Sequence, residues 1–131
     1  MFKNGNILSK KVLILIIFLV VIFGTFFVAN LKIENNKKMY EKRVTCFLLE
    51  EKGYDRTEIK SVEGFYGFKL PKYYAVVVFE DESYVKYIYY AHDGVIQIKY
   101  ILTDEAIKMN IDKSELKHYN PINEIDKYII E

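Results

Sequence analysis

The stretch from residue 59 to residue 102 decides the fold, and it reads IKSVEGFYGFKLPKYYAVVVFEDESYVKYIYYAHDGVIQIKYIL. Its side-chain pattern has a period of two, which is typical of β-strands because successive strand residues point to opposite faces of a sheet. Turn-forming residues divide the stretch at Pro71, at the acidic segment 80–83 and at the pair Asp93 and Gly94. The pattern predicts four strands, at Ile59–Tyr66, Tyr73–Phe79, Tyr84–Ala91 and Val95–Leu102.

The short connections between these strands favour sequential antiparallel pairing, which forms a meander. Asp93 and Gly94 both tolerate the positive φ that a tight hairpin turn needs. Gly64 is a further turn-tolerant position, inside the first strand. One face of such a sheet is apolar, so another element must cover it.

Upstream of the strands, apolar residues recur at helical spacing. They are Ile33, Tyr40, Val44, Phe47 and Leu48, and charged residues occupy many of the positions between them. This pattern predicts an amphipathic helix with a frayed start at Asn35 and Asn36 and a left-handed stop at Gly53. We therefore expect an α+β domain at residues 33–102, in which this helix packs on a four-stranded antiparallel meander.

The segment before this helix has the length and composition of a membrane anchor. Residues 12–31 read VLILIIFLVVIFGTFFVANL and contain no charged residue. As a helix they reach roughly 30 Å, which matches the hydrocarbon core of a bilayer. Three lysines within residues 1–11 favour a cytoplasmic N-terminus, although three more between residues 32 and 38 weaken this bias. We predict a single-pass cell-membrane protein whose residues 12–31 lie in the lipid bilayer and whose C-terminal domain is extracellular.

The alternative for this segment is a cleaved secretory signal. Such a signal has an apolar stretch of about 7–15 residues followed by a small-residue cleavage site. The apolar run here is longer, and Phe27–Asn30 at its C-terminal end have only one small residue near a position where a signal peptide could be cleaved. A retained anchor is therefore the favoured interpretation.

Residues 103–131 predict a tail with one or two short helices. Thr103 has a side chain suited to a helix N-cap, and Asp104–Met109 follow it as a short helical segment. Beyond Pro121 the chain has a weakly amphipathic end, with Ile122, Ile125, Tyr128 and Ile129 as its apolar residues.

The composition argues against nucleic acid as a partner. The 131 residues carry a net charge of +1, but three of the 19 basic residues precede residue 12, whereas all 18 acidic residues follow the apolar run. The domain is thus slightly acidic and lacks the basic surface that nucleic acid requires. The single cysteine, Cys46, borders the apolar stripe of the helix. It is either a buried small apolar residue or the site of an intermolecular disulfide in a homodimer.

The sequence has no recognisable catalytic or metal-binding spacing. His92 in the hairpin tip and His118 in the polar tail are predicted to be solvent-exposed. The acidic residues Glu80, Asp81 and Glu82 lack the ligand spacing of a calcium loop and predict a solubilising turn. We therefore expect no cofactor and no enzymatic activity, with a small hydrolytic or metal-dependent enzyme of the cell envelope as the alternative.

An aromatic face of the sheet is the candidate interaction site. If Val76, Val78, Ile88 and Tyr90 face the helix, then the outer face carries Tyr73, Phe79, Tyr87 and Tyr89. A shift of one residue in register would exchange the two faces, and the tail from residue 103 is an alternative cover for the aromatic one. Exposed aromatic residues contribute strongly to recognition. We therefore expect a non-enzymatic module that binds an envelope protein or peptide.

Several segments together resemble a known family. Glu51–Tyr54 reads EKGY, Ile59–Tyr66 reads IKSVEGFY, Tyr74–Phe79 reads YAVVVF, and Glu80–Tyr90 holds an acidic turn before a tyrosine-rich strand. With the N-terminal lysines and the apolar run, they make residues 1–102 similar to the DUF3139 family of small membrane-anchored Firmicute proteins. That family has no assigned activity, so the resemblance implies a compartment but no site residues. The predicted fold is also similar in architecture to cystatin-like and PepSY-like modules.

Overall fold

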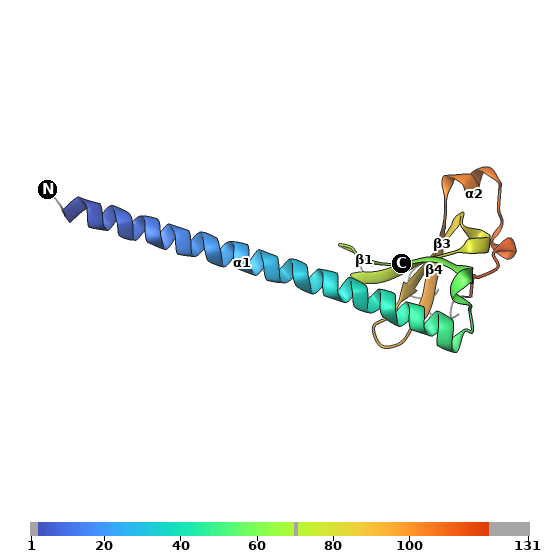
Figure 1. Cartoon of the computed structure of the whole chain (residues 1–131). Coiled ribbons are helices and arrows are strands. Elements are labelled where there is room, and N and C mark those ends of the chain that lie inside the picture. Colours follow the sequence, from blue (N-terminus) through green and yellow to red (C-terminus); the bar gives the residue numbers. More distant parts are fainter. Residues whose placement is uncertain (1–2, 70, 121–131) are drawn as a thin grey trace. The chain divides into compact units, whose positions relative to one another are not determined.

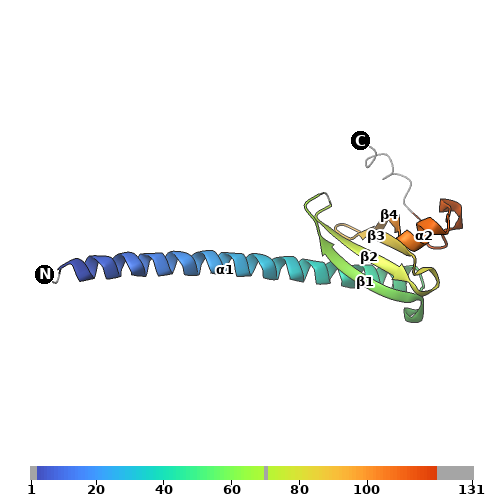
Figure 2. The same cartoon turned by 90° about the horizontal axis from the view of Figure 1, so that it is seen from above.

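The computed structural model describes residues 3–69 and 71–120, with side chains from residue 9 onward (Figure 1, Figure 2). The chain divides into two compact units, residues 1–34 and residues 35–131. The weakly amphipathic end predicted at residues 122–129 lies outside the described residues.

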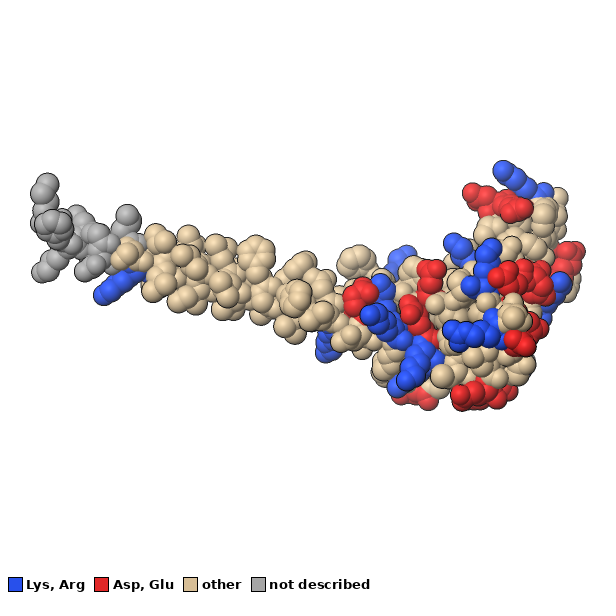
Figure 3. Space-filling model, viewed as in Figure 1, with Lys and Arg blue, Asp and Glu red and all other residues tan. Residues whose placement is uncertain are grey.

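The first unit is the N-terminal part of a long helix, α1 (Lys3–Cys46). No described residue covers its apolar side chains, and Phe23 and Phe26, for example, are each 69% exposed. Figure 3 shows no charged side chain along the middle of this segment. By length and composition, the helical stretch Ser9–Glu51 can cross a membrane. A single-pass anchor and a signal sequence are both compatible with this helix.

The second unit begins with the remaining turns of α1. These turns are helical through Asn35 and Asn36, where the sequence predicts fraying. After Cys46 the helix widens into a π-turn, η1 (Phe47–Glu51), in which the Lys52 amide donates to the Phe47 carbonyl at 3.0 Å. Gly53 then has a φ of 73°, which glycine adopts readily because it lacks a Cβ. The predicted stop at Gly53 is confirmed.

Four antiparallel strands form one sheet in the order β1-β2-β3-β4, as the meander predicts (Figure 2). They are β1 (Ile59–Tyr66), β2 (Tyr73–Phe79), β3 (Val85–Tyr90) and β4 (Ile96–Leu102). The first two have the predicted bounds, and the other two are shorter where they adjoin a turn. The helix and this sheet confirm the α+β fold.

Short helices precede, connect and follow the strands. They are η2 (Arg56–Glu58), η3 (Glu80–Glu82), α2 (Asp104–Lys108) and η4 (Lys113–Glu115). The N-cap role of Thr103 is confirmed, because its side chain accepts a hydrogen bond from the Ala106 amide. A capping box formed by Asp55 and Glu58 starts η2 in the same manner.

The helix of the second unit and the sheet share one core. Tyr40, Val44 and Leu48 of α1 are buried in it. The strand residues buried in the same cluster are Ala75, Val77, Phe79, Val85, Tyr87 and Tyr89. Of the four residues predicted to face the helix, Val76, Val78 and Ile88 are therefore wrong by one residue. The fourth, Tyr90, does contact α1, with its ring centroid 6.3 Å from that of Tyr40, because the pairing shifts between Ile88 and Tyr89. Aromatic side chains remove more apolar area from water than valines do, which favours the aromatic face as the core.

Gly64 allows β1 to approach α1 closely. A Cβ at this position would lie 2.2 Å from the carbonyl oxygen of Lys37, which no side chain permits. The Gly64 amide also donates to Glu41 Oε1 at 3.0 Å. Gly64 is thus not a turn residue but a buried strand position that pairs with Ala75.

Candidate functional site

The aromatic residues predicted to form an exposed interaction face lie in the core instead. Phe79 and Tyr87 are fully buried, and Tyr89 is 5% exposed. Tyr73 is half-buried, with its ring centroid 5.8 Å from that of Tyr40. The alternative in which the tail covers this face agrees with the structure, because the ring of His118 stacks on Phe79 at 3.9 Å.

His118 is the centre of a polar cluster that joins three distant segments. Its Nε2 lies 2.7 Å from Asp81 Oδ1, in η3, and its Nδ1 lies 2.9 Å from the hydroxyl of Tyr54. A carboxylate only accepts hydrogen bonds, so in the neutral ring Nε2 carries the proton and Nδ1 accepts from Tyr54. The side chain of His118 is only 11% exposed, which corrects the prediction of a solvated histidine.

Glu82 lies beside this cluster and is fully buried. Its Oε2 accepts a hydrogen bond from the Tyr87 hydroxyl at 2.5 Å, and its Oε1 accepts one from the Lys117 amide at 3.1 Å. The acidic segment 80–82 is therefore only partly a solubilising turn. Asp81 is exposed, but Glu82 ties η3 and the chain after η4 to the core.

The titrating groups of the cluster are held in states suited to these hydrogen bonds. The hydrogen bond from His118 holds the pKa of Asp81 below its ordinary value. Burial raises the pKa of Tyr54, and burial together with Glu82 raises the pKa of Tyr87. Burial also raises the pKa of Tyr89 to about 12. At neutral pH the phenols thus keep their protons, so that Tyr54 and Tyr87 can donate, and Asp81 is an acceptor.

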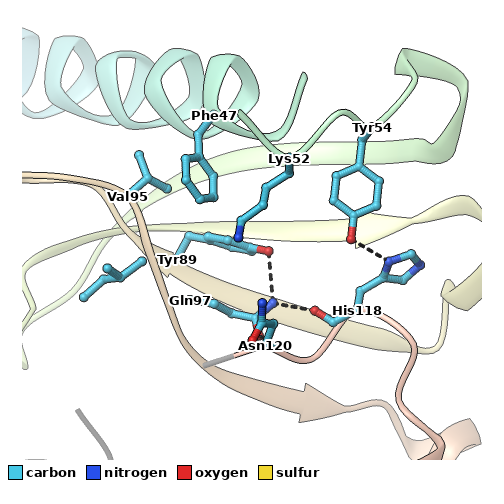
Figure 4. A pocket seen from close by; sticks show the side chains of 9 residues that line it. Phe47, Lys52, Tyr54, Tyr89, Val95, Gln97, His118 and Asn120 are labelled. Carbon is cyan, nitrogen blue, oxygen red and sulfur yellow. Dashed lines mark hydrogen bonds between the residues drawn. The ribbon is translucent and has the colours of Figure 1, made fainter. Parts of the chain in front are cut away.

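A small cavity opens next to His118 (Figure 4). Phe47, Tyr89 and Gln97 line it together with His118, and its volume is about 110 Å³. The Gln97 amide crosses its floor, donating to the Tyr89 hydroxyl at 3.0 Å and to the His118 carbonyl at 2.8 Å. A cavity of this size holds a few water molecules, whereas pockets for small-molecule substrates measure about 300–1,000 Å³.

The carboxylate, imidazole and hydroxyl of this cluster have the order of a catalytic relay, but the hydroxyl is a poor nucleophile. Burial raises the pKa of Tyr54, so its phenol keeps its proton at neutral pH. Among the described residues, no group of three His, Cys, Asp or Glu side chains could hold a metal ion. The arrangement can bind the segment around His118 to the sheet, and that is the role its hydrogen bonds support.

The remaining candidate residues lie apart from this cluster. The His92 side chain is 63% exposed, as predicted for a turn. Its backbone carbonyl accepts a hydrogen bond from Arg43 at 2.7 Å. Cys46 is half-buried and free, so the disulfide-linked homodimer stays a prediction.

The face of the sheet opposite the helix carries a larger, apolar groove. Its volume is about 470 Å³, and it lies between the β1–β2 turn and the strands. The apolar residues that line it are Phe68, Pro71, Tyr74, Ile88, Ile98 and Ile101. Ile101 is 46% exposed, whereas Ile88 is buried at the groove floor. The sequence pattern alone did not predict this groove because the two faces of the sheet were exchanged.

Comparison with known families places the chain in a group defined by sequence. The family model described as a protein of unknown function, DUF3139, matches residues 9–89, and the chain belongs to this family. The match begins in α1, just before its apolar part, and ends in β3. No curated protein and no solved structure matches the chain, so its likeness to cystatin-like and PepSY-like modules stays a prediction.

Proposed function

We propose that this protein is a membrane-anchored, extracytoplasmic binding module without enzymatic activity. Its anchor is the segment 12–31, whose apolar side chains are left exposed by the part of the chain that the structure describes. A helix of this kind is stable in lipid, because its backbone amides and carbonyls form their hydrogen bonds within the helix. The lysines at residues 1–11 favour a cytoplasmic N-terminus.

The apolar groove is the observation that carries the binding role. The helix and the His118 segment both pack on the opposite face of the sheet, so the described residues leave the groove open. Its volume and apolar lining fit side chains of an extended peptide segment, and we propose such a segment of an envelope protein as the ligand. The enzyme alternative has less support, because the polar cluster engages its own donors and acceptors.

Protease treatment of intact protoplasts tests the topology. A C-terminal tag should be removed and an N-terminal tag protected. A protected C-terminal tag would contradict the orientation, and a mature chain that begins near Asn30 would identify the apolar segment as a cleaved signal.

Photo-crosslinking in intact cells tests the groove. A photoreactive amino acid at Lys99, which lines the groove, should give a discrete crosslinked product. The same amino acid at Ile107, which is 58% exposed on α2, is the matched control. Adding Ile101→Asp to the Lys99 probe should abolish the product because it places a charge in an apolar groove. Equal products from both positions, or an unchanged product with Ile101→Asp, would contradict the binding role.

A further inference from the structure

The turn between β1 and β2 presents aromatic side chains to solvent. The Gly67 amide donates to the Lys72 carbonyl at 2.8 Å and closes the turn. Phe68, near its tip, is fully exposed, and Phe65 and Tyr66 at the end of β1 are 37% and 41% exposed. Phe65 and Tyr66 lie on opposite faces of β1, where they contact Tyr74 and Tyr73. Phe68 is thus the ring that the turn leaves fully in water, where a partner would cover its apolar surface.

The charge of this turn indicates the kind of partner. Residues 64–73 read GFYGFKLPKY and contain two lysines and no acidic residue. Both lysines, Lys69 and Lys72, are exposed. Aromatic rings combined with lysines are typical of segments that lie at the interface of an anionic bilayer, where the rings enter the headgroup region and the lysines meet lipid phosphates.

Contacts within the second unit place the turn at one end of it. At the start of β2, Tyr73 packs against Tyr40, and at its end Phe79 packs against Tyr54. The turn before Tyr73 therefore lies toward the Asn35 end of the helix and away from its end at Gly53. Gly64, near the end of β1, lies directly against the backbone of Lys37.

Chain connectivity then limits how far this end can be from the membrane. Five residues separate Leu31, the last residue of the apolar run, from Lys37. Even a fully extended chain of that length spans at most about 20 Å. The end of the domain that carries the turn is thus tethered close to the bilayer at any angle between the two units.

We propose that the β1–β2 turn is a second membrane contact, in which Phe68 enters the interface of the bilayer and Lys69 and Lys72 bind anionic headgroups. This inference rests on the proposed anchor. It gives the domain two points of attachment, the covalent one at residue 31 and the turn. The groove, which Phe68 also lines, would then open beside the lipid surface.

The chain has no tryptophan, so one substitution supplies a specific reporter. The full chain with Phe68→Trp is reconstituted into vesicles of phosphatidylcholine and phosphatidylglycerol, with or without brominated acyl chains. Its emission should lie at shorter wavelength than in detergent, and brominated lipid should quench it. Met109→Trp is the matched control, since Met109 is 52% exposed beyond β4, at the opposite end of the sheet from the turn. Its quenching should be several-fold weaker.

A charge variant tests the headgroup contact. Adding Lys69→Glu and Lys72→Glu to the Phe68→Trp chain should lose most of the quenching in anionic vesicles. Circular dichroism of the same sample checks that the domain is still folded. Undiminished quenching of the folded double variant would overturn the role of the lysines.

Flotation of the same vesicles separates the two proposals. A chain that does not float with them refutes the anchor and the inference that rests on it. If the Phe68→Trp chain floats but brominated lipid does not quench its fluorescence, the turn contact alone is refuted. Short-wavelength emission without quenching would mean that the turn packs on protein, such as a second copy of the chain, and would also refute it.

Discussion

Replacing Tyr87 with phenylalanine should lower the free energy of unfolding by about 2 kcal/mol. The change removes the hydroxyl that donates to Glu82 Oε2 at 2.5 Å, and both side chains are fully buried. A hydrogen bond to a carboxylate contributes about 1.5–3 kcal/mol when its loss leaves a buried acceptor without a donor. The phenylalanine ring fills the same space, so no cavity adds to this cost.

Thermal unfolding of the full chain in detergent micelles, followed by circular dichroism, measures this effect. For a domain of this size, a loss of 1 kcal/mol lowers Tm by about 4–8 °C, so Tyr87→Phe should lower it by roughly 10 °C. Tyr66→Phe is the matched control, because it also removes a tyrosine hydroxyl, but from a side chain that is 41% exposed. Equal Tm values for the two variants would refute the argument that the buried hydrogen bond stabilises the domain.

Close packing and titration of the same domain lead to three more expected outcomes. Gly64→Ala should cost about 3 kcal/mol in chemical denaturation, because its Cβ would lie 2.2 Å from the Lys37 carbonyl oxygen, whereas Gly94→Ala, with no atom within 4 Å, should cost little. The pKa of Asp81 is lowered in the folded state, so Asp81 stabilises the fold fully at pH values above its ordinary pKa of 3.8. This stabilisation is lost as the pH falls through the pKa of the folded state, and Asp81→Asn should therefore make stability depend less on pH in the acid range. Tyr89, with a pKa raised from 10.0 to about 12, holds its proton longer in the folded state, so stability should fall as the pH rises from 10 to 12, and less steeply in Tyr89→Phe.

The element order was predictable because each boundary has a local chemical signal. Gly53 supplies the positive φ that ends the helix, and Thr103 supplies the side chain that caps α2. The bounds of β1 and β2 agree with the period of the side-chain pattern for the same reason. These boundary signals involve only residues that are close together in the chain, so they can be recognised from a single sequence.

The choice of the core face was not predictable in the same way. Both faces of β2 and β3 are apolar, since Val76 and Ile88 alternate with Val77 and Tyr87. What decides between them is the hydrogen bonding of the folded chain: the Tyr87 hydroxyl donates to Glu82, and the Gln97 amide donates to the Tyr89 hydroxyl. Buried phenols need such partners, and these are identified only when η3 and the neighbouring strands are brought together. The position of His118 was missed for the same reason.

The segment after β4 also explains why the groove is open. Leu116 is buried in the cluster that contains the helix residues, and His118 stacks on Phe79 in the same layer. The helix and this segment therefore share one face of the sheet, and no described residue outside the sheet and its β1–β2 turn lines the groove on the other face. Phe68 borders that groove and is also the residue that we propose to enter the lipid interface. A peptide bound in the groove would then lie against the membrane surface, so the Lys99 crosslink should weaken when Lys69→Glu and Lys72→Glu detach the turn. An undiminished crosslink in that folded variant would mean that the groove binds its partner independently of the lipid contact.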